Sequence, residues 1–114
     1  MNTVQQQQEM CRIYGVPWIE APEHLKLGLA PNVRAGLQPL NGLRHPPEGN
    51  TTGWYVWAGK ELSHAPDFFE PVHVLHLAET CPSILRFLGL PAGWRFLTDG
   101  EYVDIWYDAR LLEI

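Results

Sequence analysis

The chain has 114 residues, of which 46% are hydrophobic and 18% charged, a composition typical of a globular protein rather than a disordered one. This length fits a single domain over residues 1–114 and is long enough for a core. The formal net charge is -5, and the Lys and Arg residues are scattered along the chain, which argues against nucleic-acid binding. An acidic domain suits a basic protein partner, although mild acidity also serves solubility alone.

The first half of the chain predicts a helix followed by two strands. Residues 3–14 have a helical pattern that Thr3 could cap and Gly15 would end. The Pro- and Gly-rich segment that follows predicts strands near 25–29 and 37–43. The stretch "RHPPEGNTTG" predicts a loop, because its adjacent prolines interrupt regular structure.

The stretch "TGWYVWAG" predicts a strand over residues 54–58 with apolar side chains on both faces. Trp54 and Val56 share one face, and Tyr55 and Trp57 share the other. Such a strand is expected at the centre of a sheet, with helices over one face. The second aromatic face then needs a cover from the N-terminal third of the chain or from a partner.

Two helices are expected next. Residues 72–80 follow Pro71, which suits a first helical turn, and residues 83–88 lie between Pro82 and a glycine. The segment "DFFEP" before them holds two phenylalanines. These either fill the core under a long connection or form an exposed anchor for a partner.

The sequence "GWRFLTDGEYVDIWYD" predicts a β-hairpin around Asp99-Gly100, a dipeptide typical of a two-residue type I′ turn. This turn would pair Thr98 with Glu101 and place Arg95 opposite Asp104 as an ion pair. The candidate core face of the hairpin carries Trp94, Phe96, Val103, Ile105 and Tyr107. The second face carries Arg95, Leu97, Tyr102, Asp104 and Trp106.

Together these elements predict an α+β fold, in which a mostly antiparallel sheet with a C-terminal β-hairpin packs against two or three short helices. The chain starts without the apolar segment of a signal peptide, and no apolar run is long enough to span a membrane. Two cysteines, Cys11 and Cys81, do not make a disulfide framework. A cytoplasmic protein with reduced thiols is therefore expected.

Side chains that could carry chemistry form three sets. His73 and His76 share one face of a predicted helix and could bind zinc with Cys81 or His64. Cys81 precedes a helix start, which could lower the pKa of its thiol, or it is a small buried residue. The carboxylates could form a catalytic pair or a solvated acidic rim. A small enzyme or ligand-binding domain that uses His73, His76 and nearby carboxylates is thus an alternative. The carboxylates are Glu61, Asp67, Glu70, Asp99, Glu101, Asp104 and Asp108.

Four stretches over about residues 38–108 together resemble the bacterial immunity-protein family labelled thirty-three-like. They are "PLNGLRHPPEGNTTGWYVWAGKELS", "PDFFEPVHVLHL", "CPSILRFLGLPAGWRFL" and "YVDIWYD". In that family, runs such as G-W-Y-x-W-x-G-E, F-F-x-P-x-H-x-x-H-L and D-x-W-x-D recur. One departure is Lys60, which stands where the family run has an acid.

The resemblance implies an immunity protein of a polymorphic toxin or type VI secretion system. Such a protein acts in the cytoplasm, binds a cognate toxin domain and blocks it by protein–protein contact. It is not an enzyme and needs no cofactor, metal, nucleic acid or membrane. Aromatic or Arg anchors would supply affinity, and acidic residues would steer a basic toxin. The candidate interface residues are Glu61, Asp67, Glu70, Arg95, Tyr102, Asp104 and Trp106.

Overall fold

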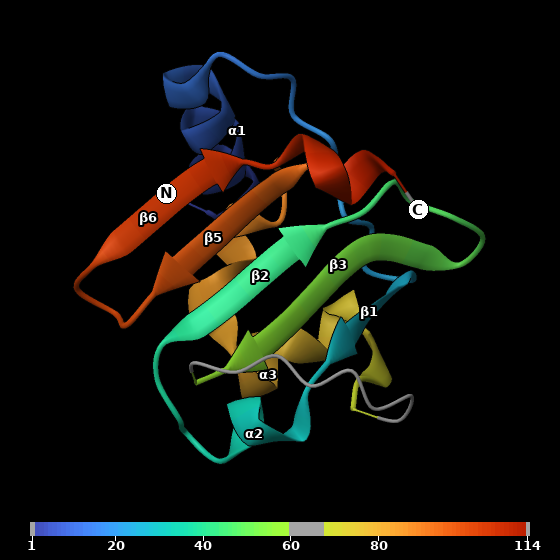
Figure 1. Ribbon diagram of the computed structural model, residues 1–114, viewed down its shortest axis with the longest axis vertical. Coiled ribbons are helices and arrows are strands. Elements are labelled where there is room, and N and C mark those ends of the chain that lie inside the picture. Colours follow the sequence, from blue (N-terminus) through green and yellow to red (C-terminus); the bar gives the residue numbers. More distant parts are fainter. Residues whose placement is uncertain (1, 60–67, 114) are drawn as a thin grey trace.

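The computed structural model describes residues 2–59 and 68–113, in which six strands form one sheet (Figure 1). The order is β4-β1-β3-β2-β5-β6, and all neighbours are antiparallel except the parallel pair β1 and β3. The strands are β1 (Lys26–Leu29), β2 (Leu40–Arg44), β3 (Thr51–Ala58), β4 (Glu70–His73), β5 (Trp94–Thr98) and β6 (Val103–Tyr107). The helices are α1 (Thr3–Tyr14), α2 (Pro31–Arg34), α3 (Leu77–Thr80) and the 3₁₀ helices η1 (Val74–His76), η2 (Pro82–Phe87) and η3 (Ala109–Leu112). The predicted α+β class and its C-terminal hairpin, β5–β6, are confirmed.

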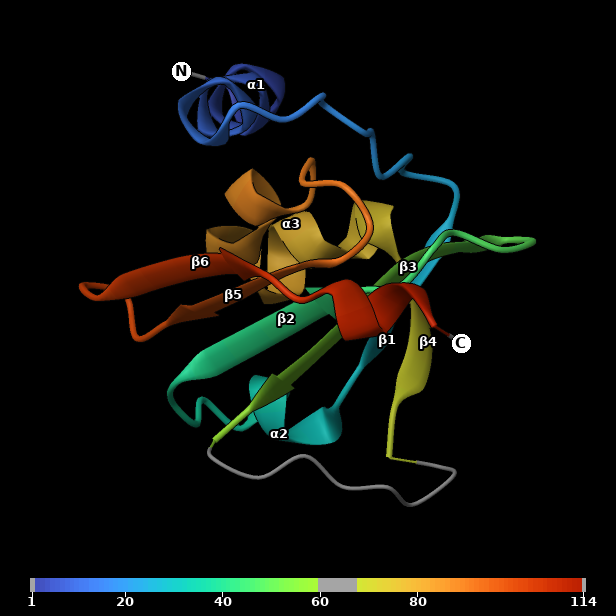
Figure 2. The same ribbon diagram turned by 45° about the horizontal axis from the view of Figure 1, so that its top comes forward.

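One face of the sheet, called here the helical face, packs against α3 and η2, and α1 lies outside them on η2 (Figure 2). Trp54 and Val56 point into this core, as predicted. Phe87 of η2 stacks on Phe96 of β5, with 4.3 Å between the ring centroids and 9° between the planes. Trp54 lies 5.7 Å from the same Phe96 ring. Each fully buried ring stabilises the fold by roughly 2 kcal/mol.

Helix α1 matches the predicted range, but its cap is Asn2 rather than Thr3. The Asn2 side chain accepts a hydrogen bond from the Gln5 N–H at 2.8 Å, and the Gln5 side chain accepts one from the Asn2 N–H at 3.0 Å. This reciprocal capping box satisfies two of the backbone donors that a helix start leaves free. Gly15 ends the helix in the left-handed conformation (φ 69°), as expected.

The helix predicted over residues 72–80 is wrong for its first two residues, Val72 and His73. Glu70–His73 forms strand β4, which pairs antiparallel with β1, so that Val72 lies opposite Leu27. Only short turns of helix, η1 and α3, follow. The second expected helix, over residues 83–88, is a 3₁₀ helix that begins at Pro82. Pairing with β1 is long-range, and local helical pattern does not reveal it.

The loop predicted by "RHPPEGNTTG" is shorter than expected, because strands extend into both of its ends. Arg44 closes β2 and Thr51 opens β3. Gly53 lies in β3 with φ 89°, and a Cβ there would lie 2.0 Å from the His45 carbonyl oxygen. The close approach lets the His45 N–H bond the Gly53 carbonyl at 2.9 Å. Glycine is therefore required at this bend of the central strand.

The β5–β6 hairpin has a four-residue turn, Asp99–Tyr102, rather than the predicted two-residue turn. Asp99 Oδ1 accepts hydrogen bonds from the backbone N–H groups of Glu101 (3.0 Å) and Tyr102 (2.7 Å), which closes the turn. Thr98 pairs with Val103, so the register is shifted by two positions. The predicted faces survive, because side chains alternate with a period of two. The predicted opposition of Arg95 and Asp104 is wrong, since Arg95 lies opposite Trp106.

Arg44 is buried at the end of β2, with 1% of its surface exposed. Its Nε and two Nη atoms donate hydrogen bonds of 2.8–3.3 Å to backbone carbonyls, and its guanidinium lies 5.6 Å from the Trp54 ring centroid. Burial lowers the pKa of Arg44 to about 10, so the group stays charged at neutral pH. One side chain thereby ties together three segments of chain. The acceptor carbonyls are those of Ile19, Glu20, Thr52, Leu88 and Leu90.

The opposite face of the sheet, called here the outer face, carries Tyr55 and Trp57. Phe69 covers them edge-on, at 5.2 Å from the Tyr55 centroid and 6.4 Å from that of Trp57. Phe68 and Leu111 belong to the same cluster, together with Ala30 and Leu43. The "DFFEP" phenylalanines thus fill a core, one of the two predicted alternatives. The cover comes largely from the middle and the C-terminal end of the chain, which the sequence did not predict.

Candidate functional site

Three of the predicted interface residues come together on the outer face of the hairpin. Arg95 of β5 lies opposite Trp106 of β6, and Asp104 lies two residues along β6 on the same face, opposite Leu97. Arg95, Leu97 and Trp106 are partly exposed, and Asp104 is exposed. This part of the outer face, at the β6 end of the sheet, is therefore accessible in the described chain.

The other predicted interface residues lie elsewhere. Tyr102 lies in the hairpin turn and is exposed, but outside both strands. Glu70 lies on β4 at the far edge of the sheet, 3.7 Å from Arg34 in an exposed ion pair. Glu61 and Asp67 fall outside the residues that the structure describes, so their place in the interface stays a prediction.

Arg95 is held from two sides. Its guanidinium lies 5.3 Å from the Trp106 ring centroid, and its Nη1 lies 3.3 Å from Asp108 Oδ2. About a quarter of the side chain is exposed (23%). Its Nε is buried without a hydrogen-bond partner among the residues described. A fixed, partly exposed guanidinium beside a tryptophan is a combination that suits recognition of another protein.

Asp108 anchors this arrangement, with only 9% of its side chain exposed. It receives hydrogen bonds from Arg110 Nε at 2.9 Å and Nη2 at 3.0 Å, and from the Arg110 backbone N–H at 3.1 Å. These bonds, with Arg95, hold the pKa of the Asp108 carboxyl well below its ordinary value. Asp108 also caps η3. Arg95 is therefore positioned by a carboxylate that is itself fixed.

The turn end of the hairpin is acidic. Asp99, Glu101 and Asp104 are all exposed, and none has an ion-pair partner within residues 2–59 and 68–113. Hydrogen bonds from the Tyr102 and Glu101 N–H groups lower the pKa of Asp99. Three carboxylates thus give this end of the molecule a negative potential that would attract a basic surface.

The opposite side of the hairpin shows an aromatic group that the sequence placed in the core. Trp94 lies 5.7 Å from Tyr107 and 5.7 Å from Tyr14 of α1, measured between ring centroids. Tyr107 is 49% exposed and Val103 is 38% exposed. The alternating pattern correctly assigned the face, but it could not show that the helices stop short of β6.

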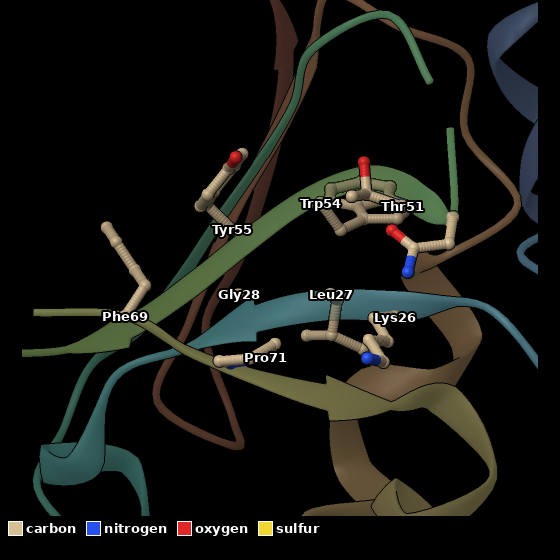
Figure 3. Close-up of a pocket in the computed structure, with 9 residues that line it drawn as sticks. Lys26, Leu27, Gly28, Thr51, Trp54, Tyr55, Phe69 and Pro71 are labelled. Carbon is tan, nitrogen blue, oxygen red and sulfur yellow. The ribbon is translucent and has the colours of Figure 1, made fainter. Parts of the chain in front are cut away.

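A pocket of about 370 Å³ opens where β1, β3 and β4 meet (Figure 3). The pairing of β1 with β3 is interrupted there, between Lys26 and Gly28. Figure 3 shows Lys26 and Pro71 on one side of the pocket and Tyr55 on the other. None of its described lining residues is an acid, a histidine or a cysteine, so they offer no acid–base pair. The lining is Lys26, Leu27, Gly28, Asn50, Thr51, Trp54, Tyr55, Phe69 and Pro71.

The alternative chemistry expected from histidines and cysteines finds little support. His73 and His76 are close, with 5.8 Å between ring centroids, but both are exposed and only His76 is helical. No group of three or more His, Cys, Asp or Glu side chains within the described ranges could hold a metal ion. Burial raises the pKa of the Cys81 thiol, which contradicts the first of the two alternatives for this residue, a lowered pKa. Cys81 is the small buried residue of the second alternative.

An acidic, partly aromatic surface on an α+β sheet is what a small protein-binding domain would present. The family model of the Imm33-like domain matches residues 6–108, nearly the whole chain. The chain therefore belongs to the Imm33-like family, whose name suggests an immunity protein, and the resemblance found in the sequence is confirmed. Comparison with curated proteins and with solved structures gave no significant match. In the part of the chain described here, no helix has the length and apolar character needed to cross a bilayer.

Proposed function

We propose that this protein is a cytoplasmic immunity protein that binds a cognate toxin domain and neutralises it by contact, without catalysis. The toxin would belong to a polymorphic toxin or type VI secretion system and would carry a basic surface. Family membership over residues 6–108 is the observation that carries the proposal. The surface chemistry of the hairpin adds to it, since the exposed carboxylates there suit a basic partner.

The outer face of the hairpin is the proposed centre of the interface. Trp and Arg side chains dominate binding energy in most interfaces, and here Trp106 and Arg95 lie together. Asp108 holds Arg95 in place, so little conformational freedom is lost on binding. Tyr102 and Asp104 would form the surrounding rim. Contributions from Glu61, Asp67 and Glu70 remain part of the proposal, as a second contact along the chain.

Co-expression with the toxin encoded by the neighbouring gene tests the proposal. Cells that carry both proteins should grow, and the two proteins should co-purify and bind with micromolar affinity or better, about 8 kcal/mol. Trp106→Ala should reduce protection, because it removes the aromatic anchor. Leu75→Ala is the matched control, since Leu75 is 54% exposed on η1 and lies away from the hairpin. Absence of both protection and association would refute the proposal.

A further inference from the structure

The outer edge of β6 is free to pair with another strand. Within residues 2–59 and 68–113, β6 pairs only with β5 (Figure 1). Two hydrogen bonds bracket the strand, from the Asp99 N–H to the Tyr102 carbonyl and from the Asp108 N–H to the Gly93 carbonyl. Because bonded and non-bonded pairs alternate in an antiparallel ladder, the backbone N–H and C=O groups of Val103, Ile105 and Tyr107 point outward.

The other edge of the sheet, β4, is blocked. The Val74 N–H bonds the Leu25 carbonyl, and the same alternation makes Pro71 and His73 the outward positions of β4. Pro71 has no N–H, so this edge offers a single outward donor. Proline and charge are the usual protections of an edge strand. Strand β6 has no proline, and Asp104 is its single charged residue.

Side chains on both sides of the β6 edge could hold an added strand. On the helical side, Tyr107 is exposed next to Trp94, and Val103 is exposed at the turn end of the strand. On the outer side lie Trp106 and Asp104. The side chains of an extended segment alternate between its two faces. A strand beside β6 would therefore contact Tyr107 and Trp94 with the side chains of one face and Trp106 with those of the other.

We infer that the outer edge of β6 binds an extended, basic segment of the toxin as a seventh strand of the sheet. This inference rests on the proposed function and names its mode of contact. The negative charge at this edge favours a basic segment, because Asp99, Glu101 and Asp104 are exposed at its turn end without an ion-pair partner in the described chain. Main-chain hydrogen bonds would supply affinity, and Lys or Arg side chains next to these carboxylates would supply direction.

Amide hydrogen exchange, followed by NMR in the free protein and in its toxin complex, tests the inference directly. The N–H groups of Val103, Ile105 and Tyr107 should exchange at least about tenfold more slowly in the complex. The N–H of His73, which points outward from the blocked edge, should exchange at the same rate in both. A complex that forms with no slowing at these three amides overturns the inference and leaves the proposed function intact. If the toxin and the protein do not associate at all, both the inference and the proposed function are refuted.

A pair of proline variants gives an independent test. Val103→Pro removes an outward N–H without removing a bond to β5, and should weaken toxin binding at least about tenfold. His73→Pro makes the same change at the β4 edge and should bind like the wild type. Thermal unfolding measures whether both variants fold. If Val103→Pro does not fold, the amide exchange rates of the wild type in the free protein and in the complex decide whether the inference holds. A folded Val103→Pro with wild-type affinity overturns the inference. So does a free wild-type dimer, seen by sedimentation, in which these amides are already protected, since the edge would then belong to a second copy.

Discussion

Two arginines on adjacent strands, Arg44 and Arg95, each lie over a tryptophan ring but in opposite circumstances. Arg44 lies 5.6 Å from the Trp54 centroid, is 1% exposed and bonds backbone carbonyls from three segments. Arg95 lies 5.3 Å from the Trp106 centroid and is 23% exposed. It has one carboxylate partner and a buried Nε with none in the described residues.

The contrast separates stability from recognition. All the acceptors of Arg44 are backbone carbonyls of its own chain, so its hydrogen-bonding capacity is used to hold the fold together. Arg95 has a single carboxylate partner among the described residues, and its partly exposed side chain faces an accessible surface. We therefore expect substitutions of Arg44 to act on folding and substitutions of Arg95 to act on binding.

The largest effect is expected from Arg44→Met. The substitution would leave buried carbonyls without a donor, and should lower the free energy of unfolding by about 3 kcal/mol or more. Arg44→Lys should be nearly as harmful, because one ammonium cannot reach the carbonyls of all three segments. Urea denaturation measures both. Arg86→Met is the control. Arg86 is partly exposed and lies over the Phe87 ring, so this substitution should lower the free energy of unfolding by less than about 1 kcal/mol. Equal losses of stability for Arg44→Met and Arg86→Met would show that the buried hydrogen bonds of Arg44 do not set it apart from a partly exposed arginine.

A smaller loss of stability is expected from Arg95→Met. Asp108 keeps its bonds to Arg110, and the methionine side chain can still cover Trp106, so the loss should be about 1 kcal/mol. Urea denaturation next to Arg44→Met compares the two sites. A loss as large as that of Arg44→Met would show that Arg95 also serves mainly to hold the fold.

The contribution of the Asp108 carboxylate to stability should disappear at low pH. Because the pKa of Asp108 in the folded state lies below its ordinary value of 3.8, its contribution to stability is present above 3.8 and is lost as the pH falls towards the folded value. Asp108→Asn should therefore be less stable than the wild type above about pH 5, and the difference should shrink towards about pH 2. Thermal unfolding across this range measures the difference. A constant difference would show that Asp108 acts through its shape and capping rather than its charge.

The smallest effect is expected from Asp104→Asn. Removing one exposed carboxylate should slow association with the toxin severalfold at low salt, and the effect should fade above about 0.15 M salt as charges are screened. Stopped-flow measurements at two salt concentrations test this. Glu79→Gln removes an exposed carboxylate from α3, away from the outer face, and should leave the association rate unchanged. Equal slowing by both variants would point to net charge rather than to the hairpin surface.

The sequence predicted the hairpin faces correctly even though the turn was wrong. A register shift of two positions returns the side chains within the two strands to their predicted faces, so Arg95, Asp104 and Trp106 lie together as expected. The predicted ion pair between Arg95 and Asp104 is wrong, because the residue opposite Arg95 depends on the register of the two strands. Asp108, counted only as one more carboxylate, is the partner that the structure shows.

Other features depend on contacts between distant segments and could not be predicted. Strand β4 exists because β1 pairs with it, although its last two residues, Val72 and His73, begin the predicted helix. Arg44 follows the strand predicted over residues 37–43 and looks like any basic residue at the surface, since nothing local shows that carbonyls from residues 19–20 and 88–90 surround it. The exposure of Tyr107 depends on where the helices end.

The affinity of Arg95→Met for the toxin, measured by calorimetry, tests the central claim most directly. Arg12→Met is the matched control, because Arg12 also forms an exposed ion pair, with Glu9 on α1, on the helical side of the sheet. We predict that Arg95→Met folds and weakens binding by at least about tenfold, or 1.4 kcal/mol, while Arg12→Met binds like the wild type. A folded Arg95→Met that binds as tightly as the wild type would contradict the claim that the hairpin recognises the toxin.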